Sequence, residues 1–232
     1  MARPPSFIFS LLAAIAWASC AIAQAPAPRA PPSAQAIANA YRAADGLIAS
    51  AKVGDLFQNL TAAAEPTVRH RGSGLTCRFG VAADAWSTDK LLVFPSGLPR
   101  GDDVGCNIHL QRFLVSLDAS RQAKTPTLDA MTAYYVNSVL AVHPQATPYV
   151  GPYVEPKALP SGFPAFRTLR FAFDDADGRA FSRLSVAIVK DWVIEERVTG
   201  PYDDAQFGDL LATAEMLGAI DSVHGGDLLK KP

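Results

Sequence analysis

The chain has 232 residues, of which 49% are hydrophobic and 19% are charged, with 21 basic and 22 acidic residues and a formal net charge of -1. This composition is ordinary for a globular protein and excludes general disorder. The charge balance argues against a polybasic nucleic-acid-binding protein as the first interpretation. It also argues against a long acidic tail. Three cysteines are too few for a disulfide-dense small scaffold or a four-cysteine zinc site.

The first 23 residues have the pattern of a secretory signal peptide. Arg3 supplies the positive charge, the stretch 6–18 is apolar, and residues 21–23 place small side chains at the two positions that a signal peptidase reads. We expect a periplasmic or secreted protein that begins at residue 24 and has no membrane span in its mature chain. A lipid anchor on Cys20 is the alternative, although Trp17 stands where a lipobox normally has leucine.

Residues 24–32 are rich in proline and alanine, which favours an extended spacer over a helix or a sheet. Residues 33–232 are expected to form a single domain. Removal of the signal peptide leaves Cys77 and Cys106, and two cysteines in an oxidising compartment most simply form one disulfide. A thiol nucleophile or a metal-ligand pair is the alternative for these two residues.

Three segments have apolar residues at helical spacing. A helix is predicted over residues 33–52, with Ser33 as its N-cap, and a second over residues 125–143, with Thr125 as its N-cap. A third is predicted to begin at Asp203. The apolar stripe that this last helix is expected to bury consists of Phe207, Leu210, Leu211, Ala214 and Leu217.

Short alternating or apolar segments predict strands at residues 75–79, 91–94 and 106–110, with 113–117 as a possible continuation of the last. Residues 165–198 predict a three-strand antiparallel meander with a hairpin turn at Asp177-Gly178. The side chains of this meander that share one face, which the last helix is expected to cover, are Leu169, Phe171, Phe173, Leu184, Val186 and Ile188. Because the strands occur in runs, we predict an α+β fold with an antiparallel β-sheet of about six strands, packed by an N-terminal, a central and a C-terminal helix.

The strand pattern from Leu184 to Val198, followed by the helical pattern from Tyr202 to Leu217, resembles the C-terminal part of PsbP-like α+β domains. The resemblance is one of pattern and covers the last third of the chain and, loosely, the central strands. It implies a curved antiparallel sheet packed by helices, and a role in binding partners or stabilising assemblies. It assigns no functional residue.

One loop has the composition of an anion-binding site. The segment from Arg69 to Gly74 is basic and contains glycines, which allow a ligand to approach the backbone closely. It lacks the spacing of a P-loop or a dinucleotide-binding fingerprint. The residues that it offers for an anionic or other ligand, with Arg78 and Arg100 as expected neighbours, are Arg69, His70, Arg71, Gly72 and Gly74. A solvated basic turn is the alternative.

Other constellations predict no chemistry. The acidic run at 174–178 does not have the ligand spacing of an EF-hand, and the four histidines are not paired at metal-ligand spacing. Glu195 and Glu196 are adjacent in a predicted strand, so their carboxyl groups point to opposite faces and cannot act as an acid/base pair. We therefore assign no catalytic residue, metal or cofactor.

These observations favour an exported, periplasmic, non-enzymatic binding or envelope-accessory module that binds an unknown protein or small molecule of the cell envelope. A hydrolase-type enzyme that uses His70 or His109 is one alternative, and a lipid-anchored envelope protein is another. A cleft in which titratable groups converge would favour an enzyme. An exposed groove or sheet edge would favour a binding module.

Overall fold

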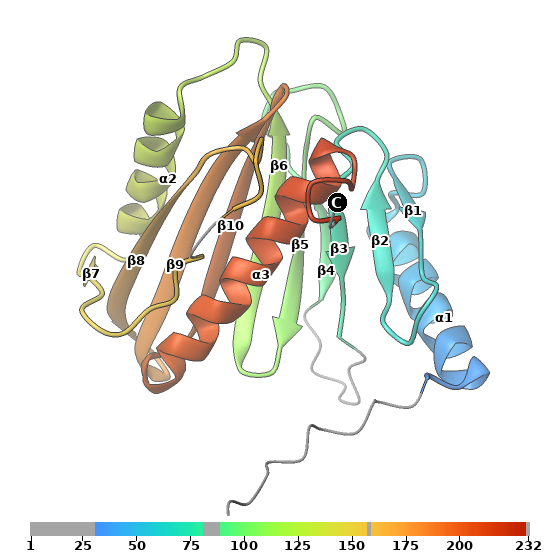
Figure 1. The fold of residues 1–232 in the computed structure, drawn as a ribbon, viewed down its shortest axis with the longest axis horizontal. Helices are drawn as coiled ribbons and strands as arrows, with labels where there is room; N and C mark the ends of the chain where they lie inside the picture. Colours follow the sequence, from blue (N-terminus) through green and yellow to red (C-terminus); the bar gives the residue numbers. More distant parts are fainter. Residues whose placement is uncertain (1–30, 81–88, 157–158, 231–232) are drawn as a thin grey trace, which may run out of the picture. The chain divides into compact units, whose positions relative to one another are not determined.

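A seven-stranded antiparallel sheet forms the centre of the protein (Figure 1). The computed structural model describes residues 31–80, 89–156 and 159–230. The sheet has the order β4-β5-β6-β10-β9-β8-β7. Its strands are β4 (Lys90–Val93), β5 (Asp103–Leu110), β6 (Phe113–Arg121), β7 (Thr147–Pro148), β8 (Phe166–Asp175), β9 (Gly178–Val189) and β10 (Trp192–Pro201).

A second, smaller sheet precedes the large one in the chain. It has the order β1-β2-β3 and contains β1 (Phe57–Asn59), β2 (Thr67–His70) and β3 (Thr76–Arg78). The α+β class and the antiparallel sheet are thus confirmed, whereas the expected sheet of about six strands is replaced by two sheets of seven and three strands. The three short strands satisfy their backbone hydrogen bonds among themselves, so they do not extend the large sheet.

Three α-helices lie close to the predicted segments. They are α1 (Ala34–Ala51), α2 (Leu128–Val142) and α3 (Ala205–His224), the last preceded by the short 3-10 helix η1 (Tyr202–Asp204). Ser33 caps α1 as predicted, because its hydroxyl oxygen accepts a hydrogen bond from the Ala36 amide at 3.1 Å. The cap of α2 is Thr127 instead of Thr125, so this helix begins later than expected.

The described residues from Pro32 onward form one compact unit. The predicted signal peptide, Cys20 and most of the spacer at 24–32 lie outside the described residues. Within the described part of the chain, no helix is both long enough and apolar enough to cross a membrane.

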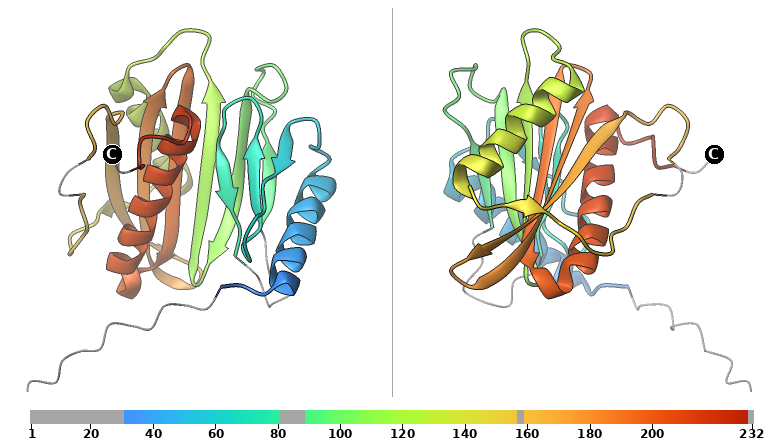
Figure 2. Two further views of the ribbon diagram at one scale, coloured as in Figure 1. Left: turned by 45° about the vertical axis from the view of Figure 1, so that its right-hand side comes forward. Right: turned by 90° about the vertical axis from the view of Figure 1, so that its left-hand side faces the viewer.

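The two faces of the large sheet are covered by different helices (Figure 2). Side chains alternate along β9, so Leu184 and Val186 pack with α2 in one cluster while Ala187 and Val189 belong to the other cluster, with α3. The opposite face of the large sheet, which α2 does not contact, is covered by α3 together with the small sheet and α1. The core therefore consists of two layers, one on each side of the sheet.

The predicted meander is confirmed as β8-β9-β10, with a two-residue hairpin loop at Ala176 and Asp177, one residue earlier than expected. Its six apolar side chains do share one face. The helix that covers this face is α2, not the last helix, which corrects our expectation. The physical reason is the alternation of the strands, since the neighbouring residues on the opposite face are those that meet α3.

The predicted stripe of α3 is wrong for most of its residues, although Leu211 does pack against the larger core. Phe207 and Leu210 are exposed, Leu210 to 52%. The residues that the helix buries against the sheet and its neighbours are Ala205, Gly208, Asp209, Ala212, Thr213, Met216, Ala219, Ile220 and Val223. Small residues dominate this face, and a Cβ atom on Gly208 would lie only 2.4 Å from the Phe113 ring, so the helix packs closely on the strands.

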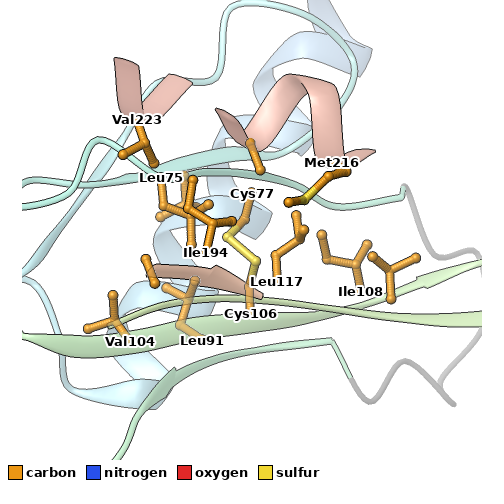
Figure 3. Packing of buried hydrophobic residues seen from close by; sticks show 14 of the residues in the cluster. Leu75, Cys77, Leu91, Val104, Cys106, Ile108, Leu117, Ile194, Met216 and Val223 are labelled. Carbon is orange, nitrogen blue, oxygen red and sulfur yellow. A yellow bond between two sulfur atoms is a disulfide. The ribbon is translucent and has the colours of Figure 1, made fainter. Parts of the chain in front are cut away.

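The predicted disulfide between Cys77 and Cys106 is present, with a Cα–Cα distance of 6.4 Å. It joins β3 of the small sheet to β5 of the large sheet. Figure 3 shows it surrounded by buried side chains that include Leu75, Leu117 and Met216. The bond is therefore a covalent link between the two sheets through the middle of the larger core.

The packing of α3 can be tested with two substitutions in the same helix. Met216→Ala removes a fully buried side chain and should lower the free energy of unfolding by about 2–5 kcal/mol. Leu210→Ala, at an exposed position, should change it by no more than about 0.5–1 kcal/mol. Urea denaturation followed by circular dichroism measures both, and equal losses would contradict this orientation of the helix.

The disulfide closes a loop between residues separated by 29 positions. The chain-entropy model gives such a loop about 3–4 kcal/mol of stabilisation, so the double variant Cys77→Ala/Cys106→Ala should lose roughly that amount. The midpoint of urea denaturation should fall similarly when the wild-type protein is reduced with dithiothreitol. A midpoint that does not respond to the reductant would show that the bond adds no stability.

Candidate functional site

A cleft of about 580 Å³ lies on the side of the large sheet that α2 covers. Its walls are aromatic, with Phe94 from the segment after β4 and Tyr134 and Tyr135 from α2. Its polar lining includes three carboxyl groups, those of Asp103, Asp118 and Glu195, from β5, β6 and β10. A concave site with apolar walls and a few converging polar groups is the usual form of a ligand pocket.

The strand register brings these carboxyl groups together. Asp118 lies directly opposite Glu195 on β10 and directly opposite Gly105 on β5. Directly opposite residues in an antiparallel pair have their Cβ atoms about 4.5–5.5 Å apart and project to the same face. Asp103 lies two residues before Gly105, so its side chain is on that face as well.

Gly105 leaves the space that the Asp118 carboxyl group occupies. A Cβ atom at position 105 would lie 1.8 Å from Oδ1 of Asp118, so no other residue fits there without moving the carboxyl group. This Oδ1 atom is inaccessible to solvent, although the Asp118 residue as a whole is only partly covered. No donor among the described residues forms a hydrogen bond to it. Asp118 thus lines the cleft with an unsatisfied acceptor.

Glu195 has a partner where Asp118 has none. Arg197 donates a hydrogen bond from Nη2 to Oε1 of Glu195 at 3.0 Å, and the same nitrogen donates to the hydroxyl of Ser138 on α2 at 3.2 Å. The arginine therefore ties the buried Glu195 to the helix above it. Such an ion pair keeps the position of the carboxyl group fixed beside Asp118.

Burial and mutual repulsion disfavour the ionised forms of these carboxyl groups. Burial, followed by the charges of Glu195 and Asp103, raises the pKa of Asp118 well above its usual range, and Arg197 opposes this only in part. Burial also raises the pKa of Glu195, against the effect of Arg197, and the pKa of Asp103. Groups with such raised pKa values in one cleft are typical of functional sites.

The aromatic wall remains open to solvent on one side. The Tyr134 ring is 63% exposed and meets the Tyr135 ring edge to face, with 5.2 Å between the ring centroids. Burial raises the pKa of the Tyr135 hydroxyl group. Among the described residues, no group of three histidine, cysteine or carboxylate side chains has an arrangement that could hold a metal ion.

A second charged cluster lies on the opposite face of the sheet, under α3. Arg183 is buried and donates from Nη1 to the backbone oxygen of Asp209 at 2.6 Å. The Asp209 carboxyl group pairs with Arg170 at 2.6 Å and accepts the Val154 amide at 2.6 Å. Glu196 is fully buried 3.8 Å from Arg183. This cluster attaches α3 and the segment around Val154 to the sheet, which is a structural role.

The structure separates the residues of the predicted anion-binding loop. His70 is 1% exposed, contacts the rings of Phe57 and Trp192, and shares a hydrogen bond of 2.9 Å between its Nδ1 and the Ser73 hydroxyl. Burial lowers the pKa of His70 to about 4, so its ring is neutral at pH 7. Arg71 donates to the Gln58 side chain on the surface. His70 therefore belongs to the core and does not reach a surface ligand.

Arg69 and Gly74 do lie together. Gly74 has a φ of 81° and its hydrogen faces the Ser222 backbone oxygen of α3, with the Arg69 guanidinium beside it. Gly72 lies against the His70 ring, away from them. Arg69 lines a separate groove of about 390 Å³ between the small sheet and the C-terminal half of α3, and Arg78 lines it too.

The carboxyl cleft was not predicted from the sequence. Asp118 and Glu195 are 77 positions apart, and only the pairing of β6 with β10 makes them neighbours. The expectation that Glu195 and Glu196 point to opposite faces agrees with their two separate environments. The available signal was the occurrence of polar residues on strands that are otherwise rich in apolar residues. These polar residues are Asn107 in β5 and, at alternate positions, Ser116 and Asp118 in β6.

Comparison with known proteins does not identify the family. No protein-family model matches the chain, and no curated protein matches it either. Among solved structures, it is similar to a protein of unknown function from Pseudomonas aeruginosa that is suggested to be a regulator, with 13% identity and a TM-score of 0.35 over 72% of this chain and 98% of that one. A likeness this distant does not identify a shared function, and the PsbP-like resemblance stays a prediction.

The buried Glu196 predicts a pH-dependent stability. Its burial raises the pKa to about 8 in the folded protein, although Arg183 opposes this shift. A carboxyl group whose folded pKa lies above its unfolded pKa disfavours folding increasingly as the pH rises from about 4.5 to about 8. Glu196→Gln should therefore raise the free energy of unfolding at pH 9 by roughly 2–4 kcal/mol and change it little at pH 4.

Denaturation of both proteins at several pH values measures this difference. Glu65→Gln, at an exposed glutamate, removes the same charge and should show no such trend. A Glu196→Gln variant that is less stable than the wild type at pH 9 would show that the ionised pair with Arg183 is favourable instead.

Proposed function

We propose that the protein is an exported, non-enzymatic binding module and that the carboxyl-lined cleft beside α2 is its ligand site. The disulfide between the two sheets supports export, because such bonds persist in oxidising compartments. The observation that carries the ligand site is the buried, unsatisfied Oδ1 atom of Asp118 in an aromatic-walled cleft. The ligand that this arrangement favours is a small organic cation with an N–H donor.

The polar lining of the cleft selects for such a cation. A protonated amine supplies a hydrogen-bond donor to the Asp118 carboxyl group, which has none among the described residues, and its charge compensates the neighbouring carboxyl groups of Glu195 and Asp103. The Arg197 charge is already paired with Glu195, so it repels the ligand less than a free arginine would. The exposed Tyr134 ring also lines the cleft, and aromatic rings attract organic cations.

Titration calorimetry with 1,4-diaminobutane tests this proposal, and choline is the comparison ligand because its nitrogen carries no hydrogen. The diamine should bind more tightly than choline. Asp118→Asn keeps the shape of the side chain and should weaken the binding of the diamine by about tenfold or more. Asp129→Asn, which removes an exposed carboxylate from α2, is the matched control and should leave the affinity within about twofold.

The raised pKa of Asp118 adds a second readout. The ammonium group binds the ionised carboxyl group, so the affinity should rise with pH and binding should release protons. The observed heat should accordingly depend on the ionisation enthalpy of the buffer. A diamine affinity that is the same in the wild type and in Asp118→Asn would refute the assignment of this cleft.

The convergence of titratable groups in one cleft is the feature that we expected of an enzyme, and it makes an enzyme the second candidate, on different residues from those that the sequence suggested. Two carboxyl groups with raised pKa values lie directly opposite each other in Asp118 and Glu195, and such a pair is suited to general acid/base catalysis. Hydrolysis of chromogenic esters or glycosides that is lost in Glu195→Gln would establish this function. A complete lack of turnover over such a panel would favour the binding module.

A further inference from the structure

The groove between the small sheet and α3 contains the only two described arginines without a bonded or stacked partner. Arg69 and Arg78 both line this groove, and neither forms a hydrogen bond, an ion pair within 4 Å or a ring contact with a described residue. The described arginines that do have such a partner are Arg42, Arg71, Arg100, Arg112, Arg121, Arg167, Arg170, Arg179, Arg183 and Arg197. The two unpaired guanidinium groups thus occur in one place.

The register of β2 and β3 places these two arginines on one face. Arg69 lies opposite Thr76 and Arg78 lies opposite Thr67, so the two side chains are diagonal neighbours. Diagonal side chains on one face of an antiparallel pair are within reach of each other when they are long. Two like charges on neighbouring positions repel each other, and an anion with several oxygens can bind both guanidinium groups.

The acidic residues of the groove do not neutralise the pair. Asp221 is already engaged, because its Oδ1 accepts the backbone amides of Leu228 at 2.7 Å and Leu229 at 3.2 Å. Glu215 forms no ion pair within 4 Å of Arg78. Burial raises the pKa of Glu215, and the charge of Arg78 opposes this only in part. Neither carboxylate therefore takes the place of a bound anion on Arg69 or Arg78.

The rim of the groove is apolar. Leu60 and Leu229 are both exposed and line it, and Ala214 and Gly218 form the adjoining surface of α3. A bare inorganic ion would leave this apolar surface in contact with water. A ligand that joins a phosphate group to an apolar part would cover the leucines and meet the arginines at the same time.

We propose that this groove binds the phosphate group of an amphiphilic molecule, with Arg69 and Arg78 as the residues that hold it. The site is separate from the carboxyl-lined cleft, and the proposal does not depend on that cleft. A phospholipid headgroup and a free organic phosphate share the recognised chemistry.

Two probes distinguish these two sources. Titration calorimetry with glycerol 3-phosphate measures the free phosphate. Co-sedimentation with phosphatidylglycerol vesicles, compared with phosphatidylcholine vesicles, measures the headgroup in a membrane. We expect binding to at least one of the anionic probes, and weaker binding at higher ionic strength because the contacts are charged.

The double variant Arg69→Gln/Arg78→Gln should reduce this binding by about tenfold or more. The matched control is Arg42→Gln/Arg71→Gln, which removes two positive charges from exposed arginines that do not line the groove. It should change the binding by less than about twofold, since only long-range charge is lost. Circular dichroism and the thermal midpoint should show that both double variants fold as the wild type does.

Binding of either anionic probe that is lost only in Arg69→Gln/Arg78→Gln supports the site and identifies the source of the phosphate. Equal losses in the two double variants would reduce the effect to general surface charge and overturn the proposal. Failure of both glycerol 3-phosphate and phosphatidylglycerol vesicles to bind the wild type would overturn it as well, without any bearing on the carboxyl-lined cleft.

Discussion

The burial of Arg183 decides how the C-terminal helix packs. A guanidinium group inside a protein needs hydrogen bonds and a counter-charge, because it has lost its contacts with water. α3 supplies the backbone oxygen and the carboxyl group of Asp209 and the hydroxyl of Thr213, and Glu196 adds a further carboxyl group. The helix must therefore turn this polar side toward the sheet, and Leu210 then faces solvent. A helix docked by its largest apolar residues would leave Arg183 without the contacts that Asp209 and Thr213 provide.

The two sides of the large sheet consequently have different properties. The side under α3 carries most of the core, the disulfide and the Arg183 cluster, in which Arg183 is hydrogen-bonded to α3. On the side under α2, the apolar cluster covers β8 and β9, whereas β5, β6 and β10 present polar residues beside the helix. The carboxyl-lined cleft is the place where this apolar cover ends. Ligand binding at that cleft would therefore leave the main core undisturbed.

Part of this arrangement was predictable because it depends on local patterns. Ser33 caps the first helix as its side chain and position suggested, and the alternation through residues 165–198 predicted the meander and the shared face of its apolar side chains. The candidate site was not predictable in the same way. Asp118 and Glu195 come from distant strands, and His70, which looked like a loop residue, fills a space between Phe57 and Trp192. Whether a side chain is buried depends on segments far away in the chain.

The sequence by itself determined the α+β class, the positions of the three helices and the pairing of Cys77 with Cys106. Helix caps, residue alternation and cysteine number act over a few residues or by elimination, so they can be read without knowing the packing. Only the tertiary structure decided that α2 and not α3 covers the apolar face of the meander, and that Arg69 and Arg78 share a groove. These outcomes depend on strand register and on which helix face satisfies Arg183, and both are set by contacts between residues that are distant in the sequence.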